Sequence, residues 1–349
     1  MWPGTVRRAS DVMIVLFPTY ARRLPDGRWR AGVEGMVTRP LPEKSRRRTL
    51  AIAVLRRLLD VTDADLESDV FRLRSEAFLF QRVAGRQVVV SVAGRPGGTA
   101  WTDRSGHFRL TVDLDAPAGG GATVNCTAES EAGEGPPVGD PARGAIQLVE
   151  PAGASVISDI DDTVKVTNVA DRRELLRNTL LRDFAAVAGM PDVFRGWQAA
   201  GTAFHYVSAS PWQLSPCLCG FLAAAGLPAG SMHLKLFRLK DSMPFGRLPS
   251  RKRSKRRVIE QIMADFPGRR FLLVGDSGER DPDVYAAVAK KRPAQVAGVA
   301  IRMVESRSSA RKVRDRLALL ARTLPAGGLT AFESPAELAA RHGLSNAFW

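Results

Sequence analysis

Cysteine is scarce in this sequence, whose 349 residues include only Cys126, Cys217 and Cys219. An odd number of cysteines, two of them one residue apart, supports neither a disulfide framework nor a four-cysteine zinc site. Scarce cysteine fits a reducing compartment, so we expect a cytoplasmic protein. An apolar run of 18 residues is also lacking, which excludes a membrane-spanning helix.

Lysine is the second scarce residue, with 9 copies among 51 basic residues; the others are arginine. The basic residues exceed the 36 acidic ones and give a formal net charge of +15. Such a surplus indicates an anionic partner, namely nucleic acid, an acidic membrane surface or a phosphorylated ligand. The alternative is compositional drift toward arginine, alanine and glycine. Nucleic acid is the least favoured partner, because the chain has no nucleic-acid-binding motif and no aromatic residues among its basic stretches.

The first part of the chain, residues 11–149, is predicted to be a β-rich domain. Its short apolar run 12–17 follows two arginines, as in a signal peptide, but no small-residue cleavage site follows it. We therefore predict a first β-strand there. Residues 107–114 alternate apolar and polar side chains, which is the pattern of a half-buried strand.

Two further strands are predicted at 88–93 and 145–149, and a helix at 50–59, where apolar residues follow a helical stripe. Residues 115–143 are rich in Gly, Ala, Pro and acidic residues, which predicts a loop. Together these elements indicate a small β-sandwich or β-barrel with one added helix.

From residue 150 to 325 the pattern changes to short apolar strands that alternate with helices. This alternation predicts an α/β fold with a parallel sheet covered by helices on both faces. Such sheets bind ligands at the carboxyl ends of their strands. Residues 326–349 are predicted to be a C-terminal tail. The expected strands are 155–159, 203–208, 233–237, 270–274 and 296–303, and the expected helices are 171–182, 191–200, 213–225, 255–264 and 283–289.

The first predicted strand of this sheet runs directly into Asp159, Asp161 and Asp162. Carboxylates so close together repel one another unless a cation neutralises them. Mg²⁺ is the natural candidate, because it prefers hard oxygen ligands. The alternative is an Asp-rich turn with helix capping, which any one of the three could provide. We therefore expect a metal-dependent site at this strand end.

Three later segments place polar groups at comparable positions. Ser208 ends a strand just before a helix, where a hydroxyl and backbone N–H groups can hold phosphate, although a Ser there is often only a cap. Lys255 opens a helix and can neutralise a phosphoryl group. Gly275 is expected to let the chain turn sharply, so that Asp276 and Asp281 supply a second acidic cluster. Each of these segments has an ordinary structural explanation when it is taken alone.

Taken together and in order, Asp-x-Asp-x-Thr, Ser, Lys and Gly-Asp-x-x-x-x-Asp resemble the haloacid dehalogenase superfamily of phosphohydrolases. The stretches SDIDDTVKVTNV, FHYVSASPWQL and FLLVGDSGERDPDVY further resemble the phosphatidate phosphatase family typified by the yeast actin-patch protein. The resemblance covers about residues 144–304, and more loosely the β-rich part. The chain shows no departure at the four motif positions.

This resemblance implies a Mg²⁺-dependent phosphatase. Asp159 would be the nucleophile that forms an aspartyl-phosphate, and Asp161 the general acid and base. Ser208, Lys255 and Thr163 would hold the phosphoryl group or orient the loop. Mg²⁺ would be bound by Asp159, the backbone carbonyl of Asp161, Asp276 and Asp281, with Asp281 either a direct ligand or one step removed. Asp162 is expected to be a loop residue.

The expected substrate is phosphatidate, an anionic phospholipid. Only 44 residues separate Thr163 from Ser208, and 46 separate Ser208 from Lys255, which leaves no room for a full cap domain over the site. The basic stretch Arg247–Arg257, which contains Lys255, could hold the site at an anionic membrane, which would make the protein peripheral; the alternative is a solvated charge run. The open alternatives are a phosphatase for a protein or a soluble phosphomonoester, and a non-enzymatic scaffold protein.

Overall fold

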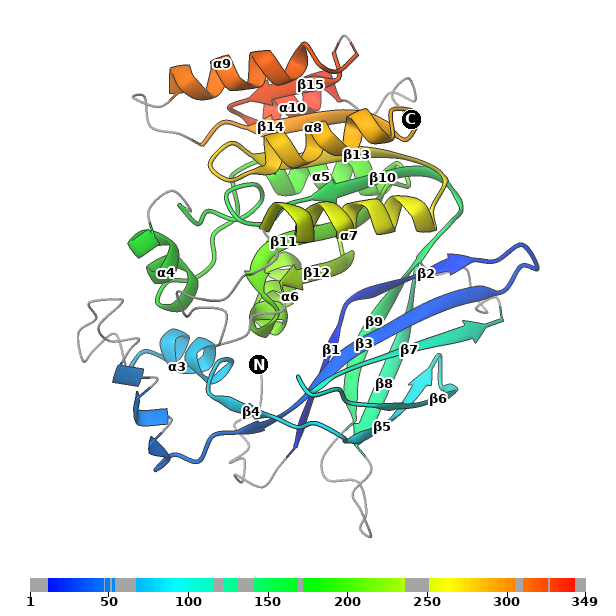
Figure 1. The fold of residues 1–349 in the computed structure, drawn as a ribbon, viewed down its shortest axis with the longest axis vertical. Coiled ribbons are helices and arrows are strands. Elements are labelled where there is room, and N and C mark those ends of the chain that lie inside the picture. The colour runs from blue at the N-terminus through cyan, green and yellow to red at the C-terminus, as the bar shows by residue number, and fades with distance from the viewer. Residues whose placement is uncertain are drawn as a thin grey trace. The chain divides into compact units, whose positions relative to one another are not determined.

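The computed structural model describes residues 12–46, 48–50, 52–53, 67–115, 122–130, 141–168, 172–235, 251–304, 310–325 and 327–342. The chain divides into two compact units, residues 1–149 and 150–349. Each unit has its own sheet, and the two are described separately below (Figure 1).

The first unit is built on a nine-stranded, mostly antiparallel sheet. Strand β3 is its longest element and pairs with β1, β2, β4 and β7. On the other side, β2 pairs with β9 in parallel, and the order continues through β8 and β5 to β6. The described elements are β1 (Met13–Phe17), β2 (Thr19–Arg23), β3 (Trp29–Pro40), α3 (Asp69–Glu76), β4 (Phe80–Arg82), β5 (Gln87–Val92), β6 (Arg95–Trp101), β7 (His107–Leu114), β8 (Thr123–Ser130) and β9 (Ala142–Val149).

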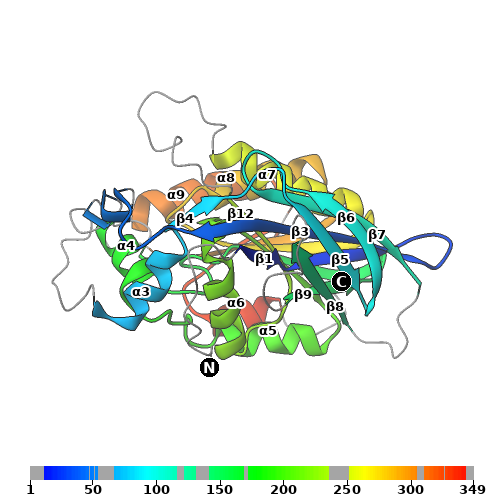
Figure 2. The same cartoon turned by 90° about the horizontal axis from the view of Figure 1, so that it is seen from below.

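Alternate side chains from strands across this sheet pack into one hydrophobic cluster, with members such as Val33, Val90, Phe108, Val124 and Ile146. Because strands of a single sheet share one core, the sheet must curve around it, and Figure 2 shows the strands crossing one another. Burying side chains of this size stabilises the fold by about 1.5–3 kcal/mol each. The predicted β-rich domain and its first strand are therefore confirmed.

Strand β8 lies inside the stretch 115–143 that was predicted to be a loop, and this part of the prediction is wrong. Val124, Cys126 and Ala128 are buried on one face of β8, which pairs with both β5 and β9. Two of these three inward residues are small, so the alternating pattern is weak beside the flanking Gly and Pro. The helix predicted at 50–59 lies largely outside the described residues. Within that range the structure describes 50, 52 and 53, and these three are helical.

The second unit contains a six-stranded parallel sheet in the order β12-β11-β10-β13-β14-β15. In the central strands β10 and β13, residues 154–158 and 271–276 are all buried, as expected for strands covered on both faces. The strands are β10 (Ala152–Ser158), β11 (Ala203–Pro211), β12 (Ser231–Lys235), β13 (Gly268–Asp276), β14 (Val296–Arg302) and β15 (Leu329–Phe332). The predicted α/β fold with a parallel sheet is confirmed.

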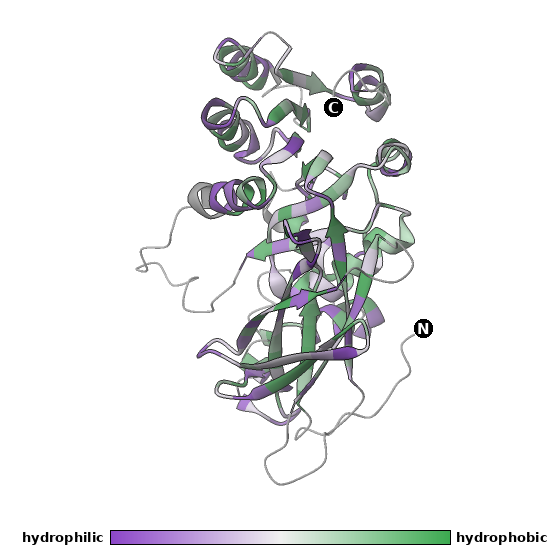
Figure 3. Ribbon diagram, turned by 90° about the vertical axis from the view of Figure 1, so that its right-hand side faces the viewer, coloured by the Kyte–Doolittle hydropathy of each residue, from purple (hydrophilic) through white to green (hydrophobic). Residues whose placement is uncertain are grey.

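Helices flank both faces of this sheet (Figures 1 and 3). Helices α7, α8 and α9 pack side by side on one face, and α5 packs with α10 on the other. No helix among the described residues is long and apolar enough to cross a membrane. The helices are α4 (Arg172–Leu180), α5 (Met190–Ala199), the 3₁₀ turn η1 (Trp212–Leu214), α6 (Ser215–Ala224), α7 (Arg251–Asp265), α8 (Asp281–Lys291), α9 (Ala310–Ala321) and α10 (Pro335–Arg341).

The stretch predicted as a C-terminal tail contributes to this unit. Strand β15 extends the sheet beside β14, and Leu338 of α10 is buried. The indole N–H of Trp197 on α5 donates to the backbone oxygen of His342 at 2.9 Å, which fixes the end of α10 against α5. Strand β15 is four residues long, too short for its pattern to stand out in the sequence.

Candidate active site

The carboxyl ends of β10, β11 and β13 lie next to one another, and the candidate residues follow them. Ser158 is paired with Tyr206 of β11 and Val274 of β13, so these strands end at the same level of the sheet. Asp159 therefore emerges between Ser208 and Asp276. This is the edge where a parallel sheet binds its ligand.

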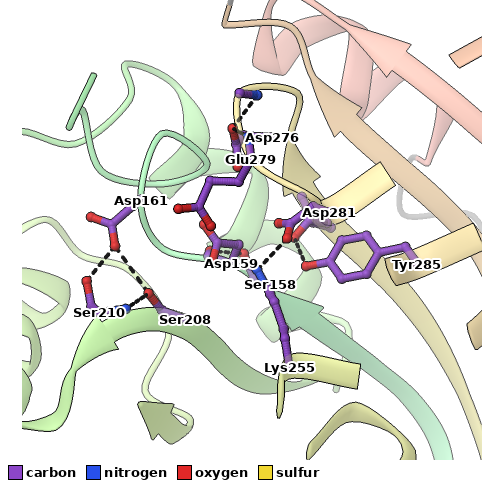
Figure 4. Close-up of polar contacts among 12 residues, drawn as sticks. Ser158, Asp159, Asp161, Ser208, Ser210, Lys255, Asp276, Glu279, Asp281 and Tyr285 are labelled. Atoms are coloured by element: carbon purple, nitrogen blue, oxygen red, sulfur yellow. Dashed lines mark hydrogen bonds and ion pairs between the residues drawn. The ribbon is translucent and has the colours of Figure 1, made fainter. Parts of the chain in front are cut away.

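Asp159 and Asp281 share one cation, the ammonium group of Lys255 on α7. Lys255 Nζ lies 2.7 Å from Asp159 Oδ1 and 2.6 Å from Asp281 Oδ1 (Figure 4). Both aspartates are 1% exposed. Burial favours a neutral amine, but the two carboxylates outweigh it and raise the pKa of Lys255 well above its usual value. Lys255 is therefore charged throughout the physiological pH range.

Asp276 ends β13 and completes an acidic cluster with Asp159 and Asp281. One carboxylate oxygen from each lies within 4.8 Å of the other two. Burial, opposed by Lys255, raises the pKa of Asp159 well above its ordinary value. Burial and the charges of Asp281 and Glu279 likewise raise the pKa of Asp276 to about 8. The single positive charge of Lys255 therefore does not balance the three carboxylates of the cluster.

The acidic cluster also has unused hydrogen-bonding capacity. Asp159 Oδ2, Asp276 Oδ1 and Asp281 Oδ2 are buried and have no hydrogen-bond partner among the described residues. Buried carboxylate oxygens without partners are rare unless they bind a cation or a ligand. Hard, anionic oxygen donors are the ligands that a small divalent cation prefers. The donor set therefore fits a divalent metal ion.

Asp161 is held by a different group of donors. Its carboxylate is contacted by Lys165 Nζ at 2.8 Å and by the hydroxyls of Thr167 at 2.9 Å, Ser208 at 3.1 Å and Ser210 at 2.5 Å. Burial disfavours the ionised form, but the Lys165 charge and the hydrogen bonds outweigh it and lower the pKa of Asp161. Asp161 is thus an ionised carboxylate beside the acidic cluster.

Lys165 reaches Asp161 because the chain turns tightly after β10. The backbone N–H groups of Val164 and Lys165 both donate to Ile160 O at 3.0 Å, which returns Lys165 to the level of Asp161. Its side chain is almost completely buried, and Nζ lies 4.6 Å from the centre of the Phe184 ring. A lysine buried to this extent needs a carboxylate partner, and Asp161 provides it.

The remaining residues of the first motif have backbone roles in the structure. Asp162 has a positive φ of 53°, and its Oδ1 accepts from the N–H groups of Thr167 and Asn168 at 2.7 and 2.8 Å. Asp162 is thus a loop residue, as expected. Thr163 is buried, but its hydroxyl has no hydrogen-bond partner among the described residues, so it makes no hydrogen bond to the acidic cluster or to Ser208.

Glycine is required at position 275 for a different structural reason from the one expected. It lies within β13, and its backbone is not in the left-handed region, so no sharp turn requires glycine there. Instead, a Cβ atom at this position would meet the Asp281 carboxylate and would lie 2.7 Å from Tyr285 Cε2. Glycine is therefore needed to let α8 bring Asp281 close to the sheet.

Among the residues expected from the sequence, the structure brings Asp159, Lys255, Asp276 and Asp281 into one cluster. Asp161 and Ser208 lie beside it (Figure 4). The Ser208 hydroxyl, expected to hold phosphate, donates to Asp161.

Sequence reasoning missed Lys165, Thr167 and Ser210 as partners of Asp161. Lys165 and Thr167 belong to the quoted stretch SDIDDTVKVTNV, and Ser210 to FHYVSASPWQL. A lysine among otherwise apolar neighbours was the one available signal for Lys165. Nothing in the sequence distinguished Thr167 or Ser210 from ordinary loop residues.

Comparisons with known proteins point to one family. Residues 154–303 match the family described as "Phosphatidate phosphatase APP1, catalytic domain". Over 250 residues the chain is 32% identical to phosphatidate phosphatase APP1 of Saccharomyces cerevisiae, covering 68% of this chain and 41% of that protein. Over 165 residues it is 34% identical to an uncharacterized protein of Schizosaccharomyces pombe, covering 46% of this chain and 27% of that protein. The chain thus spans less than half the length of these curated relatives.

Among solved structures, a HAD-like phosphatase from Mesorhizobium loti aligns with 58% of this chain and 97% of its own. The identity is 14% and the TM-score is 0.32, a similarity too low to support an argument.

Proposed function

We propose that the chain, through residues 154–303, belongs to the family described as phosphatidate phosphatase APP1, catalytic domain, and that it is a phosphoric monoester hydrolase, namely a metal-dependent phosphatidate phosphatase. We propose in addition that the two compact units are separate domains, the second of which is catalytic. The observation that carries the proposal is a buried aspartate, Asp159, with one oxygen on Lys255 and the other without a partner at the carboxyl edge of the sheet.

Asp159 is the proposed nucleophile. Its Oδ1 is bound by Lys255, whereas Oδ2 has no hydrogen-bond partner among the described residues and can approach phosphorus. Attack by Oδ2 forms an aspartyl-phosphate and breaks the bond to the alcohol oxygen. The Ser158 hydroxyl donates to the backbone oxygen of Asp159 at 2.7 Å and helps to hold the strand end in position. Water then hydrolyses the aspartyl-phosphate, which releases phosphate and restores Asp159.

Asp161 is the proposed acid for the departing alcohol and the base for the water. In the structure it is ionised, partly because Ser208 and Ser210 donate to it. A phosphoryl group bound at Ser208 would compete for these hydroxyls. Each hydrogen bond lost from the carboxylate raises its pKa and makes proton uptake easier. Substrate binding would therefore prepare Asp161 to carry a proton, while Lys165 keeps the side chain in place.

Mg²⁺ is the proposed metal, held by one carboxylate oxygen each of Asp159, Asp276 and Asp281 and by the backbone carbonyl of Asp161, while the other oxygen of Asp159 reacts with phosphorus. When bound, it would neutralise charge on these carboxylates and on the phosphoryl oxygens. Positioning and charge neutralisation account for most of the catalysis in phosphoryl transfer. The ammonium group of Lys255 also neutralises charge on Asp159 and Asp281. The Ser208 hydroxyl would donate to a phosphoryl oxygen. Thr163, whose buried hydroxyl has no hydrogen-bond partner among the described residues, is proposed to orient the loop that carries Asp159.

Phosphate release from phosphatidate in mixed micelles tests the proposal. Asp159→Asn and Asp161→Asn should each reduce the rate by about three orders of magnitude or more, since each removes a reacting group. The matched control is Asp192→Asn on α5, whose side chain is 75% exposed. Normal activity in a folded Asp159→Asn protein would falsify the nucleophile assignment. With ³²P-labelled phosphatidate, the wild-type chain should also become labelled, and Asp159→Asn should not.

The lipid part of the proposal has separate support and a separate test. The matched family and the yeast relative are both described as phosphatidate phosphatases, and the spacing of the motifs leaves the site without a large cap. The competing substrates are soluble phosphomonoesters and phosphoproteins. A rate that is higher for soluble esters than for phosphatidate at equal concentration would replace the lipid assignment, whereas no turnover of any ester would favour a scaffold role.

We further propose that the protein works in the cytoplasm at an anionic membrane surface, with the basic stretch Arg247–Arg257 as the contact. Part of this stretch lies outside the described residues, and the rest begins α7, the helix that carries Lys255. All three cysteines are free, which fits a reducing compartment. Co-sedimentation with phosphatidylglycerol vesicles, but not with phosphatidylcholine vesicles, is expected. Neutralising Arg251, Lys252 and Arg253 should weaken it.

A further inference from the structure

A cavity of about 600 Å³ adjoins the acidic cluster in the second unit. Ser208, Lys255 and Asp281, beside which the phosphoryl group would bind, are among its lining residues. Three further cations line the same cavity, namely Lys235, Arg280 and Arg316. The alcohol part of a phosphomonoester bound at Ser208 would have to occupy this space, so its lining bears on the substrate.

Most charges around the cavity are already paired. Arg316 Nη2 lies 2.9 Å from Asp283 Oδ2, and Lys255 is bound to Asp159 and Asp281. Glu279 also lines the cavity, but in Figure 4 its carboxylate points toward Asp159.

Lys235 and Arg280 differ from these residues. Neither side chain has a hydrogen bond or an ion pair with any part of the chain that the structure describes. Lys235 is half-buried and Arg280 is exposed. Two positive charges thus line a cavity beside the site without a partner among the described residues.

The fold places these two cations at the end of β12 and at the start of α8. Lys235 is the last residue of β12 and is paired with Pro211 of β11, three residues beyond Ser208. Arg280 directly precedes Asp281 at the start of α8. Both therefore lie at the same carboxyl edge of the sheet as the proposed phosphoryl site, on separate elements that approach it from two directions.

We infer that this cavity binds a second anionic group, a phosphate or a carboxylate, beside the phosphomonoester that is cleaved, with Lys235 and Arg280 as its ligands. The group can belong to the same substrate molecule or to a neighbouring lipid headgroup. This inference rests on the proposed function only for the position of the cleaved ester. Lys235 and Arg280 would select among substrates and take no part in the reaction at phosphorus.

Binding of phosphonates, which the enzyme does not cleave, tests the inference without turnover. In calorimetric titrations with MgCl₂ present, the wild-type protein should bind 3-carboxypropylphosphonate more tightly than butylphosphonate. Lys235→Gln and Arg280→Gln should each weaken binding of the carboxylate ligand roughly threefold, and the double variant roughly tenfold, as for partly exposed ion pairs. Binding of butylphosphonate should not change.

The matched control is Lys290→Gln, which removes one positive charge from the exposed surface of α8 outside the cavity lining. It should bind both phosphonates like the wild type. Equal affinity of the wild type for the two ligands, or equal losses in the control and the two cavity variants, would overturn the inference.

Turnover distinguishes the two sources of the second anion and separates this inference from the proposed function. A preference for 3-carboxypropyl phosphate over butyl phosphate indicates a group on the same molecule. Faster cleavage of phosphatidate in phosphatidylglycerol than in phosphatidylcholine micelles, lost in the double variant, indicates a neighbouring headgroup. If no ester is cleaved but the phosphonate preference persists, the proposed function fails while the anion site stands.

Discussion

Replacing Asp276 by asparagine should stabilise the metal-free protein even though it removes a proposed metal ligand. Asp276 lies with Asp159 and Asp281 in the acidic cluster, but Lys255 contacts only the other two carboxylates. Its Oδ2 accepts from two backbone N–H groups of the following loop, at 2.6 and 3.1 Å, and an asparagine oxygen can accept the same bonds. The substitution therefore removes charge with little change in shape.

The size of the effect follows from the pKa of about 8 that burial and the neighbouring acids give Asp276, against an ordinary 3.8. A tenfold change in a protonation constant corresponds to about 1.4 kcal/mol, so holding this carboxyl in the fold at pH 7 costs about 4 kcal/mol. Coulomb's law supports this order of magnitude, since two charges within 4.8 Å repel by about 3 kcal/mol or more at an effective dielectric constant of about 20. Asp276→Asn should raise the free energy of unfolding by roughly 2–4 kcal/mol.

The pH dependence of this difference has a defined sign. The pKa of Asp276 is higher in the folded than in the unfolded state, so the folded protein binds the proton more tightly. The stability that this group contributes is complete below about pH 3.8 and is lost as the pH rises through about 8. The advantage of Asp276→Asn should therefore grow from about 2 kcal/mol near pH 5.5 to about 4 kcal/mol at pH 7.

Urea denaturation in EDTA, followed by tryptophan fluorescence, measures this difference. Trp197 and Trp212 are buried in the second unit and report its unfolding. Adding MgCl₂ should stabilise the wild type, because a ligand that binds only the folded state raises the free energy of unfolding. Asp276→Asn should gain much less, and Asp192→Asn, the exposed control, should behave like the wild type under both conditions.

Two results would refute this reasoning. Equal stability of the wild type and Asp276→Asn in EDTA across this pH range would show that the acidic cluster carries no uncompensated charge. An equal gain from MgCl₂ in both proteins would show that Asp276 does not contribute to metal binding.

Three further predictions concern residues around the site. Lys165→Met should lower the free energy of unfolding by about 3 kcal/mol, since it leaves Asp161 buried without its cation, and should slow hydrolysis; urea denaturation and initial rates measure the two effects. Gly275→Ala should lower both kcat and metal affinity, because the added methyl group displaces Asp281; calorimetric Mg²⁺ titration tests this. Burial, followed by the charges of His233 and Arg269, lowers the pKa of His205 well below 6.5. The stability that the neutral imidazole contributes is therefore present above about pH 6.5 and is lost as the pH falls below that value. His205→Phe should reduce this acid-induced loss of stability, measured by urea denaturation.

Each of these has an outcome that contradicts it. Wild-type stability in Lys165→Met would mean that Asp161 does not depend on its ion pair. Unchanged Mg²⁺ affinity in Gly275→Ala would mean that Asp281 does not need the close approach of α8. An identical acid-induced loss of stability in the wild type and His205→Phe would assign that loss to other groups.

The sequence by itself determined the architecture of the second unit and the edge that carries the site. Its strands are short, apolar and separated by helices, and that periodicity is a local property of the chain. Because the carboxyl ends of parallel strands meet at one edge of the sheet, the sequence alone predicts that Asp159, Ser208 and Asp276 lie close together. Strands β8 and β15 were not predicted, because small inward residues weaken the alternating pattern of β8 and β15 has only four residues. Both are identified as strands by their pairing with neighbouring strands.

Tertiary structure alone decided which polar groups meet. The sequence places Lys165 four residues after Asp161 and Ser210 two residues after Ser208, but only the turn after β10 and the end of β11 bring these side chains onto one carboxylate. The need for Gly275 depends on how closely α8 approaches β13, and the cavity lined by Lys235 and Arg280 joins residues from two separate elements. Contacts of this kind depend on distances between elements far apart in the chain, which local sequence patterns do not encode.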